Sequence, residues 1–190
     1  MYLSRPGHEN PYVLMALDYI ILENEYILVM EYCDEKWATL AKYVEKKGPL
    51  DIRDVRDIVR EVVDAMIYLK QRGIVHNDIH AENVMYNLET GRIKLIDFGM
   101  SAILPGWKEG KSVPSKFLNS PSTVLEYKAE FNELHSMQTL GYLIYSIITG
   151  RDPYIETLSY EAMLRETLFP ESDTYRSGLK ESAISLMAAL

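Results

Sequence analysis

The sequence of 190 residues has one cysteine, no block of basic residues and no long apolar run. A single cysteine, Cys33, excludes an internal disulfide and fits a reducing compartment. The net charge of −8, with acidic and basic residues mixed along the chain, does not favour a nucleic-acid or anionic-membrane surface. No stretch approaches the apolar length of a bilayer span, and the first residues lack a signal-peptide core. These absences predict an intracellular, cytoplasmic protein.

What the chain does contain is enough apolar material for a folded core. Hydrophobic residues make up 47% of the sequence and aromatic residues 11%, which argues against disorder. The length suits one domain or a small two-lobed unit. Two β-branched and aromatic stretches, residues 12–22 and 26–32, are separated by a short polar turn and predict a hairpin.

Helical patterns dominate the rest of the chain. Apolar residues at helical spacing predict helices over residues 37–47 and 51–72, the second with Asp51 as its N-cap and Gly73 as its stop. Residues 133–150 are apolar nearly all round and predict a buried helix, whereas residues 74–97 have the pattern of short strands and turns and residues 100–122 that of a loop. The order predicts an α+β fold with unequal lobes. Further helices are expected at residues 160–167 and 178–190.

Polar residues interrupt the strand-like stretch IVHNDIHAEN and the following KLIDFG. Polar groups in an apolar context are costly unless they are used. They can satisfy turns, or a His-x-Asp-x-His pattern can present metal ligands on one strand face. They can also serve phosphoryl transfer, which needs an acceptor-orienting carboxylate and oxygen ligands for magnesium. The residues concerned are His76, Asp78, His80, Asn83 and Asp97.

HNDIHAEN followed by DFG resembles the catalytic loop H-R-D-L-x-x-x-N and the magnesium motif D-F-G of the eukaryotic protein kinases. The resemblance implies the protein-kinase-like fold with ATP and Mg²⁺ as cofactors. It makes Asp78 the catalytic base, Asn83 and Asp97 the metal ligands, and places His80 where these enzymes usually have a lysine. The hinge and adenine contacts would then involve Glu31, Cys33 and Met85.

The resemblance covers nearly the whole chain and divides it into two parts. YILVMEYC is similar to the last strand of the kinase N-lobe, and LGYLIYSIITGRDPY to the buried helix of the C-lobe. Residues 1–33 would be remnant N-lobe strands and the hinge, and residues 34–190 a largely helical C-lobe with an incomplete C-terminus. Within that lobe we expect the catalytic loop at 76–83, the DFG motif at 97–99 and the activation segment at 97–122.

Several positions depart from the kinase pattern. No G-x-G-x-x-G occurs, and the strand lysine and glutamate that grip the phosphates have no candidates, so the N-lobe is expected to be truncated. The catalytic-loop arginine is Asn77, and histidine at position 80 is similar to haspin and small-molecule kinase variants. Ser122 replaces the glutamate of APE, and Ser136 replaces the aspartate of the buried helix. SMQTLGY is similar to the corresponding motif of casein-kinase-type kinases.

Three hypotheses follow from this pattern. The first is Mg·ATP-dependent phosphoryl transfer to serine or threonine of a protein substrate, impaired by the missing phosphate clamp. The second is a catalytically dead pseudokinase that binds a kinase or its substrate, with the apolar surface covered by a partner or by dimerisation. The third is that these residues are a piece of a longer reading frame that encodes the N-lobe upstream. Neither a nucleic acid nor a membrane is an expected partner.

Overall fold

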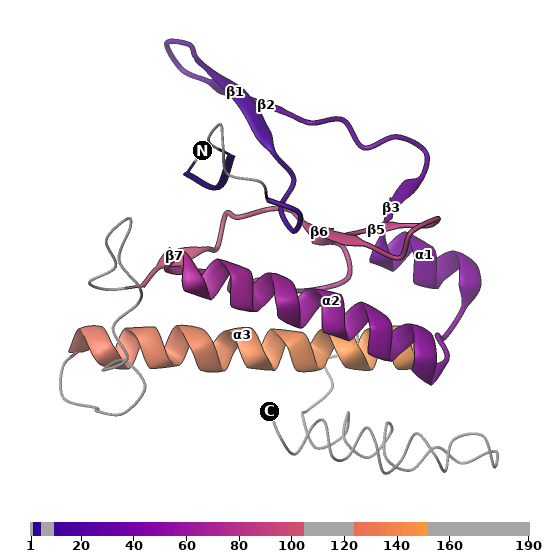
Figure 1. Cartoon of the computed structure of the whole chain (residues 1–190). Helices are drawn as coiled ribbons and strands as arrows, with labels where there is room; N and C mark the ends of the chain where they lie inside the picture. The colour runs from indigo at the N-terminus through magenta and orange to yellow at the C-terminus, as the bar shows by residue number, and fades with distance from the viewer. Residues whose placement is uncertain (1, 5–9, 105–123, 152–190) are drawn as a thin grey trace.

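The structure is a computed structural model and describes residues 2–4, 10–104 and 124–151. A strand pair comes first, two helices and several short strands follow, and the longest helix comes last, which agrees with the predicted α+β fold (Figure 1). A short 3-10 helix, η1 (Tyr2–Ser4), precedes the first strand. The predicted helices at 160–167 and 178–190 lie outside the described residues, as does most of the activation segment.

The predicted hairpin is present, with shorter strands. β1 (Ala16–Ile21) pairs with β2 (Tyr26–Met30) in antiparallel register, and the pair projects from the rest of the molecule (Figure 1). The residues before β1 leave the hairpin because they pair elsewhere. Val13 forms a parallel bridge with Leu95, and the Leu14 N–H donates to the Leu95 carbonyl at 3.1 Å.

The helix predicted over residues 37–47 is wrong in its first three positions. β3 (Trp37–Thr39) is a strand that joins β5 (Val84–Asn87) and β6 (Ile93–Leu95) in an antiparallel sheet of order β3-β5-β6. The helix itself, α1 (Leu40–Lys47), begins after Thr39, whose hydroxyl accepts from the Lys42 N–H at 3.3 Å. Cross-strand pairing with β5 overrides the helical spacing of the local sequence.

The helix α2 (Ile52–Gln71) confirms the prediction for residues 51–72. The Asp51 carboxylate accepts hydrogen bonds from the backbone N–H groups of Arg53 and Asp54 at 2.8 and 3.1 Å. After the last turn, Gly73 has φ of 71°, a left-handed conformation that favours glycine. The apolar stripe of the helix is buried at Val55, Ile58, Val59, Val62, Ala65 and Leu69.

The predicted buried helix is α3 (Val124–Thr149), which lies alongside α2 (Figure 1). It begins nine residues earlier than the predicted start at residue 133, because its first residues are mixed polar and apolar and carry no continuous apolar signal. In the second half of α3 the buried apolar side chains are Leu140, Leu143, Ile144, Tyr145 and Ile147.

None of the helices within the described residues is long and apolar enough to cross a membrane.

The remaining strands connect the site to α2 and α3. β4 (Ile74–Val75) pairs with β7 (Ala102–Ile103), which lies inside the stretch predicted as a loop. Residues 76–83 run between β4 and β5, and residues 96–101 between β6 and β7, so each predicted motif links the β4-β7 pair to the β3-β5-β6 sheet. This arrangement brings two segments together that are about twenty residues apart in the sequence.

Candidate active site

His76 is the buried link between the two motifs. Its side chain is 2% exposed, and its Nε2 lies 3.0 Å from the Ile96 carbonyl oxygen, which can only accept a hydrogen bond. The imidazole also packs on the Phe98 ring, with centroids 4.6 Å apart. Burial lowers the pKa of His76, although the Ile96 carbonyl and the nearby carboxylates oppose this shift. The ring is therefore neutral near pH 7, with its proton on Nε2.

Asp78 and Asn83 form a direct side-chain pair across the turn 78–83. The Asn83 Nδ2 donates to both the Asp78 carbonyl and the Asp78 Oδ2, each at 3.0 Å. Because two acceptors fix the amide nitrogen on that side, the Asn83 amide oxygen faces the other way. His80 Nε2 lies 3.5 Å from the same Asp78 Oδ2. The loop thus holds one carboxylate oxygen in place and leaves Oδ1 and an amide oxygen available to ligands.

Asp97 follows β6 in a left-handed conformation. Its φ is 57°, and its Oδ1 accepts a hydrogen bond from the Gly99 N–H at 3.1 Å. A Cβ at Gly99 would lie 3.1 Å from this oxygen, so a larger residue there would crowd the Asp97 carboxylate. The Ile96 N–H donates to the Asn83 carbonyl at 3.0 Å, which anchors the residue before Asp97 to the catalytic loop. The exposed Asp97 carboxylate and Asn83 are thereby held on adjoining segments.

The oxygen donors fit magnesium better than a soft metal. Asn83 and Asp97 offer an amide oxygen and a carboxylate, and Mg²⁺ is commonly held by one or two protein oxygens plus phosphate oxygens and water. Within the described residues, no three His, Cys, Asp or Glu side chains are grouped as a metal site would require. The His-x-Asp-x-His interpretation therefore has no support from the described part of the chain.

The predicted adenine contacts lie beyond the hairpin. The Glu31 Oε1 accepts from the Met15 N–H at 2.7 Å and from Lys94 Nζ at 2.5 Å. Among the described residues the backbone N–H and carbonyl of Cys33 have no backbone partner. Burial raises the pKa of the Cys33 thiol, which therefore stays protonated near pH 7. Met85 is half-buried in β5, where it pairs with Thr39 and Lys94 in register. These three assignments stay predictions.

Two contacts of the site were not predicted from the sequence. The first is the Glu31–Lys94 ion pair, which joins the end of the hairpin to β6. The second joins two departures from the kinase pattern, because the Ser136 hydroxyl donates to Asn77 Oδ1 at 3.3 Å. Asn77 is buried in a left-handed conformation with φ of 64°, and its Nδ2 also donates to the Met100 carbonyl at 3.2 Å. The signal in the sequence was that both positions differ from the kinase pattern.

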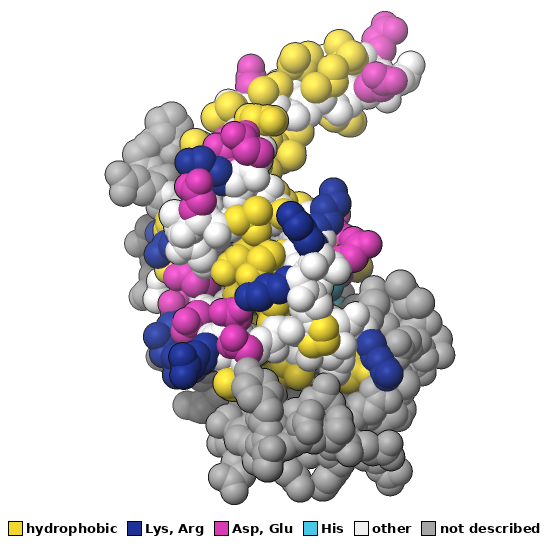
Figure 2. All heavy atoms as spheres, turned by 90° about the vertical axis from the view of Figure 1, so that its right-hand side faces the viewer, with side chains coloured by type: hydrophobic (Ala, Val, Ile, Leu, Met, Phe, Trp, Pro, Cys, Tyr) yellow, Lys and Arg dark blue, Asp and Glu magenta, His cyan; other side chains and the backbone are white. Residues whose placement is uncertain are grey.

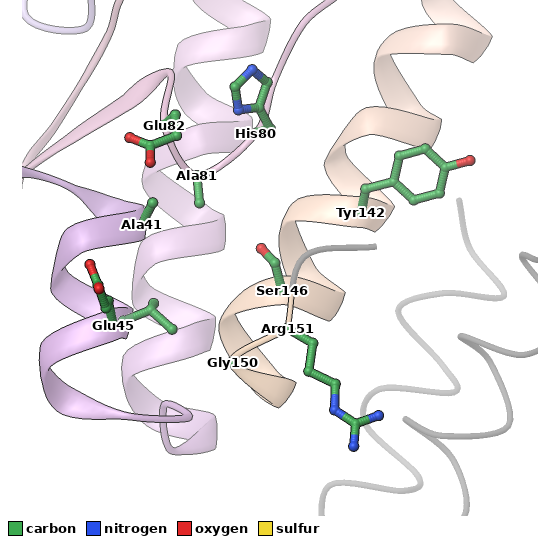
Figure 3. Close-up of a pocket in the computed structure, with 10 residues that line it drawn as sticks. Ala41, Glu45, His80, Ala81, Glu82, Tyr142, Ser146, Gly150 and Arg151 are labelled. Atoms are coloured by element: carbon green, nitrogen blue, oxygen red, sulfur yellow. The ribbon is translucent and has the colours of Figure 1, made fainter. Parts of the chain in front are cut away.

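A hollow of about 210 Å³ opens beside His80. Figure 3 shows His80 on one side of the hollow and Tyr142 and Ser146 of α3 on the other, whereas the Glu82 side chain points away from α3. Glu45 and Arg151 line its lower part in this view. The hollow therefore adjoins the loop that carries Asp78 and presents both acidic and basic groups to whatever approaches from this side.

Comparisons with known proteins agree with this geometry. The model of the protein kinase domain matches residues 3–190. The hormonally up-regulated neu tumor-associated kinase of Homo sapiens is 28% identical over 184 residues, which cover 95% of this chain and 25% of that protein. The serine/threonine-protein kinase pim-2 of Danio rerio is 30% identical over 155 residues, covering 80% of this chain and 48% of the relative.

The sperm motility kinase 2B of Mus musculus is 27% identical over 161 residues, which are 84% of this chain and 32% of that kinase. The chain thus spans about a quarter to a half of the length of these relatives. The family match, by contrast, spans nearly the whole chain and includes both the catalytic loop and the segment around Asp97. On this ground the chain belongs to the protein kinase family and has its α+β fold.

Proposed function

We propose that this chain carries the metal-binding and acceptor-orienting part of a phosphotransferase that moves phosphate from Mg·ATP to serine or threonine of a protein. One observation supports this most directly: the Ile96 N–H and carbonyl are bonded to Asn83 and His76, so Asp97 is fixed next to the catalytic loop. Transfer of a phosphoryl group depends mainly on such positioning and on charge stabilisation.

The residues of the loop would divide the work as follows. Asn83 and Asp97 would hold Mg²⁺, which when bound neutralises charge on the nucleotide phosphates. Asp78 would accept the hydrogen bond of the acceptor hydroxyl through Oδ1, since Oδ2 is already bonded to Asn83. The hydroxyl oxygen would form a bond to the γ-phosphorus as the bond to the bridging oxygen breaks, the hydroxyl proton would pass to Asp78, and ADP would leave. His80 Nε2 lies 3.5 Å from Asp78 Oδ2, so its imidazole would adjoin the acceptor hydroxyl.

We expect transfer by these 190 residues to be slow. The sequence has no G-x-G-x-x-G loop to cover the phosphates, and the strands that precede the catalytic loop in the described residues are the hairpin, β3 and the two-residue β4. Loss of such electrostatic contacts in a phosphotransferase costs orders of magnitude in rate. Weak binding of Mg·ATP with residual transfer is therefore the expected behaviour.

The test is a thermal-shift titration with ATP, with and without Mg²⁺, followed by a phosphate-transfer assay on a mixed peptide library. We expect a magnesium-dependent rise of Tm that is lost in Asp97→Asn, and transfer that is lost in Asp78→Asn. Asp57→Asn, on the exposed face of α2, is the matched control and should behave as wild type. The absence of any magnesium-dependent shift at millimolar ATP would contradict the proposal, because a ligand far above its Kd visibly raises stability.

A specific observation favours the second candidate function, a binding module without catalysis. Figure 2 shows hydrophobic side chains covering the projecting hairpin, with acidic side chains at its tip. These apolar side chains are 38 to 81% exposed, an amount that usually marks an interaction site. A kinase-like partner or a second copy would cover them. They are Leu17, Tyr19, Ile20, Ile21, Leu22, Tyr26, Ile27, Leu28, Val29 and Met30.

Sedimentation velocity of the wild type and of a variant with Ile20→Lys and Leu28→Lys separates the two functions. A binding module predicts concentration-dependent association that the double variant abolishes. A monomer at all concentrations that captures no kinase-like partner would count against this candidate and leaves phosphoryl transfer as the function to test.

A further inference from the structure

A second cavity lies between α2 and α3, with His76 at one part of its wall. Its volume is about 350 Å³, within the range of small-molecule sites, which begins near 300 Å³. The lining is mainly apolar. It includes Val63, Met66 and Ile67 of α2, Met137 and Leu140 of α3, and the ring of His76.

His76, which lines this cavity, has an unpaired ring nitrogen. His76 is almost fully buried, and its Nδ1 is one of two buried side-chain polar atoms without a hydrogen bond among the described residues. Since the proton is on Nε2, facing the Ile96 carbonyl, Nδ1 of the neutral ring is an acceptor. Leaving a buried acceptor unpaired is costly, so a donor that reaches it would be favoured.

The other polar groups of the lining do not supply that donor. Ser136 donates its hydroxyl proton to Asn77 Oδ1. Lys70 also lines the cavity, but it lies on a half-buried part of α2 and has an interaction of its own. A carboxylate at Nδ1 is excluded because it has no proton to donate. The occupant must therefore be apolar over most of its surface and present one neutral donor.

We propose that this cavity binds a small neutral aromatic molecule with one hydroxyl group, and that the hydroxyl donates to His76 Nδ1. An aromatic body suits the two methionines of the wall, because thioether sulfur makes favourable contacts with ring edges. The bound molecule would touch the same imidazole whose Nε2 holds Ile96 and whose face packs on Phe98. The site does not depend on whether the chain transfers phosphate.

Methionine methyl NMR on the full chain tests the proposal, with 1-naphthol as the probe. We expect saturable shifts of the Met66 and Met137 methyl resonances and none at Met15 and Met30, which are exposed near the hairpin. The matched probe 1-methylnaphthalene has a similar shape and no donor, so we expect its affinity to be about five- to tenfold lower. Equal affinities would overturn the hydrogen bond to Nδ1, and no saturable shift would overturn the site.

A pair of variants places the binding in this cavity. Ile67 lines the cavity and is 49% exposed, so Ile67→Trp can fill the entrance without burying a strained core residue. We expect it to abolish the naphthol-dependent shifts. Leu88→Trp is the control, since Leu88 is 48% exposed and lies outside the cavity. Unchanged binding in Ile67→Trp, or equal loss in both variants, would contradict the assignment.

Discussion

The hairpin and the α2–α3 pair are held by different forces. The strands β1 and β2 pair with each other, and every residue of β2 is exposed. On α3, by contrast, Leu143 and Ile147 are fully buried. Backbone pairing alone contributes little net stability in water, whereas burial of aliphatic side chains contributes about 1.5 to 3 kcal/mol each. A two-stranded hairpin without a covered face is marginal, so the helical body carries the stability.

The junction between the two regions is built from few contacts. Glu31 and Lys94 are paired with side chains only 24% and 18% exposed, and Val13 pairs with Leu95 close by. The candidate adenine contacts lie at the same place. A hairpin that moves on this junction would therefore move the candidate adenine contacts with it.

The largest loss of stability is expected when a buried side chain of the α2–α3 pair is shortened. Leu143→Ala removes a fully buried side chain and should lower the free energy of unfolding by about 2 to 5 kcal/mol. Ile20→Ala on the hairpin, where the side chain is 44% exposed, should change it by no more than about 0.5 kcal/mol. Urea unfolding followed by circular dichroism measures both. Similar losses in the two variants would mean that the hairpin is buried in solution.

An intermediate effect is expected at the junction. Lys94→Met keeps the length of the side chain but leaves the Glu31 carboxylate with one partner fewer, which should cost about 1 to 3 kcal/mol. The loss should be reflected in faster amide hydrogen exchange of β2 more than of α2. Lys36→Met, which removes an exposed ion pair with Glu89, is the control. If amide exchange of β2 is equally fast in both variants, the Glu31–Lys94 pair does not hold the hairpin.

The sequence predicted those parts of the fold that local signals determine. Asp51 caps the start of α2, and Gly73 ends it in a left-handed conformation. The spacing of the apolar residues between them is enough to predict the helix. Residues 37–39 have helical spacing too, but they pair with a strand nearly fifty positions later. Such pairing depends on register with a distant segment, which local periodicity does not contain.

The candidate site shows the same division. The residues of the catalytic loop and Asp97 could be named because their spacing is short and specific. The Asn77–Ser136 and Glu31–Lys94 contacts span 59 and 63 positions and were not predicted. Each is made from residue types that are ordinary on a protein surface. Their importance comes from burial in the fold, which a single sequence does not show.

His76 gives a smaller, pH-dependent effect in the body. Because burial lowers the pKa of His76 in the folded state, the unfolded state binds a proton first as the pH falls. The contribution of His76 to stability is fully present above the ordinary histidine pKa of about 6.5. It is lost as the pH falls below that value, by at most about 1.4 kcal/mol per pH unit. Urea unfolding at pH 7.5, 6.0 and 5.0 should show this slope, and His76→Leu should reduce it. An equal slope in the variant would assign the proton uptake to another group.

The smallest effect is expected at the start of α2. Asp51→Ala removes the acceptor for the N–H groups of Asp54 and Arg53 and should lower Tm by a few degrees, whereas Asp51→Asn keeps an acceptor and should lower it less.

These N–H groups lower the pKa of Asp51, so its stabilising effect is present above about pH 3.9 and is lost as the pH falls further. Thermal melts at pH 7 and pH 3 measure both statements. The difference between wild type and Asp51→Ala should shrink at pH 3, because a protonated carboxyl is a weaker acceptor. A constant difference would show that the cap acts through geometry alone, and that the body owes less to charge at its helix ends than to the burial that the hairpin lacks.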